Sequence, residues 1–201
     1  MELGPFLLAS LLVELTPGPN MAWLAIVGVS QGRSRGFAAV AGVALGLAVV
    51  GALAAIGLGG VISASPLLYG LLRWAGILWL LWLAWDGWRE ASEDLEEVPT
   101  GWGLGRYFRR GLVTNLLNPK AAVFYLAVLP TFTDPILPIL PQTLTLSAAF
   151  VVIATAIHAS IVALAGLAAP LLQDPRRSRL LRRALSVALA LVAVWFAWET
   201  S

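Results

Sequence analysis

Six long apolar runs constrain the fold of this 201-residue chain more than any other feature of its sequence. A helix needs roughly 20 apolar residues to cross the hydrocarbon core of a bilayer, and each run is long enough. The runs are far longer than the roughly 10 alternating residues of a membrane-barrel strand. The sequence therefore predicts an all-α integral membrane protein with six transmembrane helices. The runs extend over about 3–29, 36–62, 66–86, 111–131, 143–172 and 180–198.

The composition agrees with a membrane protein and excludes several other classes. Hydrophobic residues make up 59% of the chain and charged residues only 12%, whereas soluble domains carry about 25% charged residues. This balance excludes soluble enzymes, disordered proteins and nucleic-acid readers. The chain has no cysteine, which excludes disulfides, thiol chemistry and cysteine-ligated metals.

Basic residues are concentrated in alternate connections between the runs. Eleven of the 13 Lys and Arg residues lie in or beside the first, third and fifth connections, at about 30–35, 87–110 and 173–180. Cytoplasmic loops carry the excess of Lys and Arg, and acidic residues contribute little to orientation. Six spans with these connections inside place both termini outside. The sequence thus predicts a multi-pass protein of the inner (plasma) membrane with external termini.

Proline interrupts two of the runs, the first and the fourth. A proline inside a helix removes a backbone hydrogen bond, and hydrocarbon offers no water to the freed groups, so such a break must face buried protein or a wet cavity. Thr16 and Asn118 are residue types that cap helix N-termini, and Pro17 and Pro119 would then take the first helical position. Each break is predicted to begin a half-helix with exposed N–H groups and a positive dipole end. The segments are Thr16, Pro17, Gly18, Pro19 and Asn20 in the first run, and Asn118, Pro119 and Lys120 in the fourth.

The two breaks occupy equivalent positions in the chain. Pro17 and Pro119 are 102 residues apart, and each lies in the first run of a group of three. Because each half has an odd number of spans, one half is inverted relative to the other. Interrupted segments at corresponding positions indicate the central site of a transporter with inverted repeats, whereas kinks that only shape packing need no such match. We expect one transmembrane domain, with repeat A at about 1–88, a cytoplasmic connection at about 89–110 and repeat B at about 111–201.

Charged and polar residues at membrane depth complete the predicted site. A lysine there costs about 2.5–3.5 kcal/mol on insertion scales and marks a function by default, so Lys120 is expected to bind a substrate carboxylate or to form a structural ion pair. Glu14 could pair with Lys120, bind a substrate ammonium or carry a coupling proton. His158 is a candidate proton relay, with a hydrogen-bonded core histidine as the alternative. Asn115 lies one turn before Asn118 and is expected to line the same cavity.

Several stretches carry a resemblance to a known family. They are Thr16 to Asn20, Gly32 and Arg33 followed by Gly36, and Asn118 to Phe124, with Pro130 further on. At this spacing they resemble the LysE/RhtB family of amino-acid exporters over nearly the whole chain. The resemblance implies a six-helix inner-membrane exporter of amino acids or related small metabolites, driven by the membrane potential or an ion gradient. The resemblance also implies export without ATP hydrolysis. The sequence agrees with this, because it contains no phosphate-binding loop of the GxxxxGK type.

These observations predict a secondary transporter that works by alternating access. A zwitterionic or cationic amino acid would enter from the cytoplasm, and its carboxylate would meet Lys120 and the N–H groups that follow the prolines. Asn20 and Asn118 would orient the substrate, and Glu14 or backbone carbonyls would bind its ammonium. Rocking of one half against the other would then open the outside.

Other functions and partners were weighed on the same residues. The alternatives are a passive channel and a non-transporting structural or assembly membrane protein. A membrane-embedded enzyme is disfavoured because the chain has one histidine, no cysteine and no paired aspartates. No cofactor, metal or nucleic-acid partner is expected. The expected partners are the small-molecule substrate, membrane lipid and a second copy of the chain, packed through small-residue faces such as Ala184 with Ala188 and Ala193 with Ala197.

Overall fold

The computed structural model describes residues 2–16, 19–64, 66–89, 103–165 and 175–200, and every regular element within these ranges is a helix. Each of the six apolar runs contains helix, which confirms the all-α class. The elements are α1 (Leu3–Leu15), α2 (Pro19–Ser30), α3 (Arg33–Ala64), α4 (Pro66–Arg89), α5 (Leu104–Leu116), α6 (Pro119–Val123), the π-helix η1 (Phe124–Val128), the 3-10 helix η2 (Leu129–Phe132), α7 (Ile139–Ala163) and α9 (Pro175–Thr200).

Two helices of the described part are long and apolar enough to cross a membrane. They are α3 over Arg33–Gly57, with a mean hydropathy of 2.5, and α7 over Ile139–Ala163, with a mean hydropathy of 2.1. A third span arises if Leu104–Leu116 and Lys120–Phe132 are taken together across a bend of 51°. This composition supports a multi-pass membrane location.

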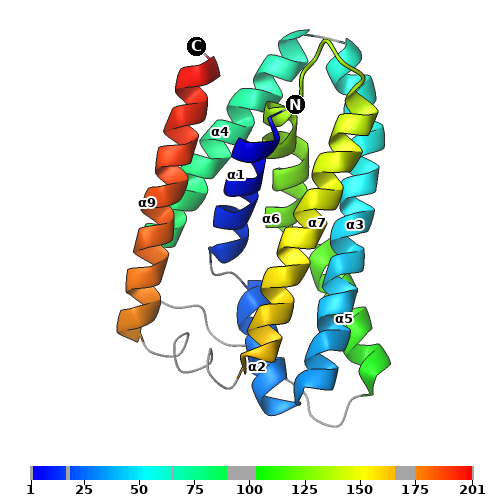
Figure 1. The fold of residues 1–201 in the computed structure, drawn as a ribbon, viewed down its shortest axis with the longest axis vertical. Helices are drawn as coiled ribbons and strands as arrows, with labels where there is room; N and C mark the ends of the chain where they lie inside the picture. Colours follow the sequence, from blue (N-terminus) through cyan, green and yellow to red (C-terminus); the bar gives the residue numbers. More distant parts are fainter. Residues whose placement is uncertain (1, 17–18, 65, 90–102, 166–174, 201) are drawn as a thin grey trace.

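The helices run up and down along one long axis (Figure 1). Both chain termini lie at one end, which we call the termini end, together with the connection from η2 to α7. The backbone N–H of Glu2 donates to the carbonyl of Phe132 at 3.0 Å and holds α1 to this end. The turn from α2 to α3 and the beginnings of α5 and α9 lie at the opposite end. Because Arg33, Arg35 and Arg106 lie in these segments, we call this the basic end.

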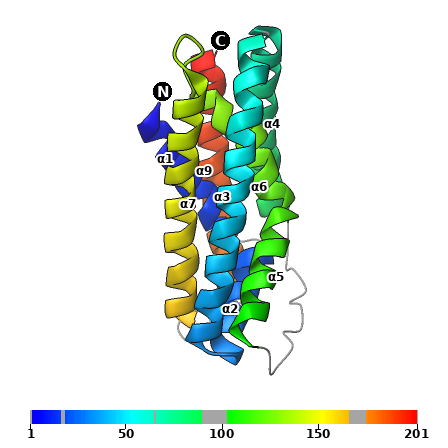
Figure 2. The same ribbon diagram turned by 90° about the vertical axis from the view of Figure 1, so that its right-hand side faces the viewer.

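Two apolar clusters hold the helices together. The larger one fills the termini-end half, where the rings of Phe124 and Phe150 stack with centroids 4.0 Å apart and Phe6 meets Phe132 edge to face at 5.2 Å. A smaller cluster of Trp23, Leu24, Tyr107, Val162 and their neighbours joins α2, α3, α5 and α7. Around these clusters α3 packs against α5 and α7, and α4 packs against α9 (Figure 2).

Small residues permit the closest of these helix contacts. A Cβ atom placed on Gly42 of α3 would collide with the backbone carbonyl of Phe108 on α5, and one on Gly111 of α5 would collide with the carbonyl of Ala39. Gly46, one turn after Gly42, lies against Asn115. The Gly42–Gly46 pair therefore lets two backbones approach, as small residues do between membrane helices.

The beginning of α5 differs from the sequence prediction. The third connection was expected to continue to residue 110, but α5 already begins at Leu104. Its first turns are amphipathic: Tyr107 is fully buried, whereas Arg106 and Arg109 are exposed. A search for uninterrupted apolar runs misses such a helix because only one face of it is apolar.

One of the two small-residue faces expected at a dimer contact is used inside the protomer. Ala193 is completely buried in the larger apolar cluster, and Ala197 packs against that cluster. Ala193 is therefore not available for an outward-facing contact, whereas Ala197 is partly exposed. Ala184, from the other pair, is exposed.

Candidate transport site

The residues predicted for the site surround one narrow cavity near the middle of the long axis. The cavity lies where the α1–α2 and α5–α6 segments meet, with α3 and α7 closing its sides. Its volume is about 20 Å³, which is room for about one water molecule. Six of its nine lining residues were candidates from the sequence. The nine are Glu14, Asn20, Met21, Leu47, Asn115, Asn118, Lys120, Ala121 and His158.

Two hydrogen bonds across the cavity join residues about a hundred positions apart in the sequence. The Lys120 ammonium donates to the backbone carbonyl of Thr16 at 3.1 Å. The amide nitrogen of Asn20 donates to the amide oxygen of Asn115 at 3.2 Å. Lys120 thus lies at the carboxyl end of α1, where unpaired carbonyls and the negative end of the helix dipole favour a cation.

Asn118 has the local role that the sequence predicts. Its side-chain oxygen accepts from the backbone N–H of Lys120 at 3.0 Å, and Pro119 takes the first position of α6. This is the ordinary chemistry of an N-cap asparagine followed by a proline. The cap fixes where α6 begins and so brings Lys120 into its first turn.

Thr16 does not have its predicted role. It was expected to cap the second half-helix, but its hydroxyl donates back to the carbonyl of Leu12 at 2.8 Å, and it forms the C-cap of α1. Its extended backbone (φ −65°, ψ 115°) is the conformation that a following proline favours. The next half-helix, α2, begins at the second proline, Pro19. Pro17 and Gly18 lie outside the described residues.

The two remaining titratable residues of the cavity contact each other. Nε2 of His158 is 3.4 Å from a carboxylate oxygen of Glu14, and both residues are buried, at 3% and 7% exposure. Nδ1 of His158 and the amide nitrogen of Asn115 have no hydrogen-bond partner among the described residues. The cavity therefore combines a carboxylate, an ammonium, an imidazole and a spare amide donor in a space with room for about one water molecule.

Three lining residues were not among the sequence candidates. Met21 and Ala121 adjoin Asn20 and Lys120 in the sequence, so a search of the neighbours of each break would have found them. Leu47 on α3 carries no such signal, because only the packing of α3 against α5 brings it to the cavity. These apolar walls are typical of small-molecule sites, in which a few polar groups fix orientation.

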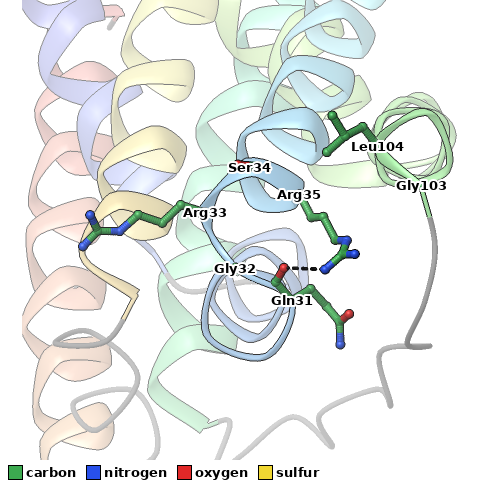
Figure 3. A pocket seen from close by; sticks show the side chains of 7 residues that line it. All are labelled: Gln31, Gly32, Arg33, Ser34, Arg35, Gly103 and Leu104. Carbon is green, nitrogen blue, oxygen red and sulfur yellow. Dashed lines mark hydrogen bonds between the residues drawn. The ribbon is translucent and has the colours of Figure 1, made fainter.

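A second cavity of about 350 Å³ lies at the basic end, around the turn from α2 to α3 (Figure 3). Gly32 makes this turn with a positive φ of 85°, which only glycine adopts at no steric cost. The Arg35 guanidinium donates to the carbonyl of Gln31 at 3.0 Å. Figure 3 shows Arg33 and Arg35 pointing to opposite sides of the turn, so they do not converge on one ligand.

Comparison with known proteins gives one consistent result. The profile of the family described as LysE type translocator matches residues 11–200. A homoserine/homoserine lactone efflux protein of Salmonella typhimurium is 32% identical over 96% of this chain and 94% of its own length. A leucine efflux protein of Klebsiella pneumoniae is 31% identical over 64% of this chain and 62% of its own length. No solved structure matches the chain.

Proposed function

The chain belongs to the LysE type translocator family, and on that basis we propose that it exports a small amino acid across the inner membrane by alternating access. A translocator moves its substrate without a chemical reaction, so no catalytic residue is assigned. The observation that carries the proposal is one cavity in which both interrupted segments meet, lined by the Lys120 ammonium, the buried Glu14 carboxylate and three asparagines.

The substrate class follows from the cavity and from the relatives. The Lys120 ammonium and the N–H groups at the beginning of α2 suit a carboxylate, and Glu14 suits an ammonium. Both groups occur in every α-amino acid, including homoserine and leucine, which the relatives are named for exporting. We therefore assign a small α-amino acid as the substrate and these residues as its first contacts.

Six spans in two inverted halves would complete the fold. In this arrangement α1–α2, α3 and α4 form repeat A, and α5–α6, α7 and α9 form repeat B. A two-fold axis in the membrane plane would bring equivalent helices together, and α3 does pack against α7 and α4 against α9. The interrupted segments α1–α2 and α5–α6 would then be equivalent broken spans whose half-helices begin at the central cavity.

The contracted cavity supports a transport cycle with large rearrangements. Binding sites for small molecules usually measure about 300–1,000 Å³, so a cavity of about 20 Å³ cannot hold an amino acid. Opening requires the bond from Lys120 to Thr16 and the bond from Asn20 to Asn115 to separate. A substrate carboxylate and ammonium would replace these contacts, which offsets the cost of opening. We propose that Glu14 and His158 carry the proton that couples this step to the proton gradient.

Counterflow in proteoliposomes tests the proposal. Proteoliposomes that contain the wild-type protein and are loaded with unlabelled homoserine or leucine are expected to accumulate the labelled compound transiently. A passive channel cannot produce this accumulation. Lys120→Ala is expected to abolish this accumulation because the carboxylate loses its charge partner. Arg109→Ala removes one positive charge from an exposed position outside the cavity and should transport normally.

Folding must be checked alongside transport, because Lys120 also bonds to Thr16. Size-exclusion elution and thermal unfolding in detergent would show whether the alanine variant is intact, and Lys120→Arg would test whether charge alone is enough. Normal counterflow by an intact Lys120→Ala protein would refute the assignment of this residue.

A further inference from the structure

A group of small and hydroxyl-bearing residues lies beside the cavity, toward the termini end. Ser10 on α1 is one turn before Glu14, and Gly51 on α3 is one turn after Leu47. Residues four apart on a helix share a face, so both lie on the faces that line the cavity. Since α1 runs away from the termini end and α3 runs toward it, both are nearer that end than the cavity residues (Figure 1).

Tyr125 and Ser147 occupy the same level on the other two elements. Tyr125, on η1, follows Lys120 by five residues in the direction of the termini end. Ser147, on α7, precedes His158 by eleven residues, which is about three helical turns and returns to the same face. Four elements beside the cavity, α1, α3, η1 and α7, therefore carry a hydroxyl or a glycine on its termini side.

The hydroxyls of this group have unmet hydrogen-bonding capacity. The side-chain oxygens of Ser10, Tyr125 and Ser147 are buried and have no hydrogen-bond partner among the described residues. A buried polar group without a partner costs about 1–3 kcal/mol. Such groups are uncommon in folded proteins, and each calls for an explanation, of which a bound water or ligand is one.

Gly51 brings two of these hydroxyl-bearing residues together. A Cβ atom on Gly51 would lie 2.9 Å from Cζ of Tyr125 and 3.1 Å from Cβ of Ser147. The carbon that bears the tyrosine hydroxyl is therefore at most about 6 Å from the serine Cβ. Phe150 meets the Tyr125 ring edge to face at 5.3 Å, so the ring is held in place.

The tyrosine is also directed toward the site. Side chains on a helix tilt toward its N-terminus, so the Tyr125 side chain tilts toward the end of its helix that carries Lys120. Five helical residues rise about 7.5 Å, comparable to the reach of a short amino acid from its carboxylate to the end of its side chain. Tyr125 lies in a π-helix, a rare conformation that often marks functional sites.

We infer that Tyr125 and Ser147 form the side-chain subsite of the transport site and select a short side chain that ends in a hydroxyl. The inference rests on the proposed function and adds the substrate's side-chain chemistry to it. A substrate hydroxyl supplies the hydrogen bonds that the two residues lack. An apolar side chain of equal size leaves them unpaired, and sites built for a hydroxyl reject such analogues strongly.

Homoserine and norvaline test the inference, because they differ only in a hydroxyl in place of a methyl group. Wild-type protein in proteoliposomes is expected to prefer homoserine in counterflow kcat/KM. Tyr125→Phe and Ser147→Ala are each expected to lower the preference for homoserine over norvaline by about tenfold or more. Ser186→Ala is the matched control, because it removes another buried hydroxyl without a described partner, on α9 and outside the cavity lining.

The other outcomes separate this inference from the proposed function. If the variants slow both compounds equally, the hydroxyls line a common path and the side-chain subsite is refuted. The subsite is also refuted if the variants transport both compounds as the wild-type protein does. It is refuted again if the wild-type protein transports norvaline as readily as homoserine. The proposed function stands in each of these cases. If the wild-type protein exchanges no amino acid at all, the proposed function fails and the subsite fails with it.

Discussion

At the scale of single residues, the site is a set of polar groups that satisfy one another across two interrupted segments. Lys120 meets the carboxyl end of α1, Asn20 meets Asn115, and Glu14 meets His158. Each contact joins the first half of the chain to the second. Removing one partner leaves the other polar group without its hydrogen bond, which costs about 1–3 kcal/mol where that group is buried. On the proposed function, the same contacts hold the cavity closed, and their groups would engage the substrate.

Glu14→Gln tests the proposed coupling role at this scale. Glutamine keeps a hydrogen-bond acceptor for His158 but cannot bind and release a proton near neutral pH. We expect the variant to need more homoserine for half-maximal counterflow, because the substrate ammonium loses its charge partner. It should still exchange homoserine at saturating concentration, which needs no net proton movement, and it should lose uptake driven by an imposed pH gradient. Both are measured with labelled homoserine in the same proteoliposomes. A variant that still responds fully to the pH gradient would show that the proton is carried elsewhere.

Sequence reasoning succeeded where a role depends on neighbours along the chain. Asn118 caps α6 because the cap and its proline are adjacent, and the sequence predicts it directly. Thr16 also precedes a proline and was expected to cap a helix in the same way. However, α2 begins at the second proline, Pro19, and Thr16 is the C-cap of α1. Tyr125 and Ser147 carry no local signal, since their hydroxyls matter only because α3 places a glycine beside both.

At the scale of elements, close backbone approach between α3 and α5 positions the cavity. Gly42 and Gly111 bring the two backbones together, and Gly46 lies against Asn115, which lines the cavity. Glycines four residues apart, as Gly42 and Gly46 are, form a pattern that permits close contact between membrane helices. The sequence did not predict the helical beginning of α5, because the residues from Leu104 to Arg110 are apolar on one face only.

Gly42→Ala is expected to destabilise the protein, and Gly57→Ala is its control in the same helix. A Cβ atom on Gly42 would press against a backbone carbonyl of α5, whereas one on Gly57 meets nothing within 4 Å. Forcing an extra carbon into a packed contact costs about 1–3 kcal/mol, and an alanine in an open helical position gains helix propensity. Thermal unfolding in detergent should show a lower midpoint for Gly42→Ala alone. Equal midpoints for the two variants would mean that the α3–α5 contact adapts freely.

At the scale of the whole molecule, the proposed pair of inverted halves would account for the placement of charge as well as for the site. With three spans in each half, the chain would begin and end each half on opposite sides of the membrane. Successive connections between the spans would therefore lie on alternate sides of the membrane. The basic residues of the α2–α3 turn and of the beginning of α5 lie at one end of the molecule, and both termini lie at the other (Figure 1). Since basic residues favour the cytoplasm, we expect the termini to lie outside and the hydroxyls of Tyr125 and Ser147 to lie on the exit side of the cavity.

Cysteine labelling tests this orientation without background, because the chain contains no cysteine. Ile136 is 90% exposed in the connection at the termini end, and Ser34 is exposed at the basic end. Ile136→Cys is expected to react with a membrane-impermeant maleimide when the inner membrane is intact, and Ser34→Cys only after the membrane is permeabilised. If only Ser34→Cys is labelled in intact membranes, the protein has the opposite orientation to the one expected. The hydroxyl subsite would then lie on the side from which the substrate enters. Labelling of both positions would mean that the two ends do not face opposite sides of the membrane, which would contradict six spans in two inverted halves.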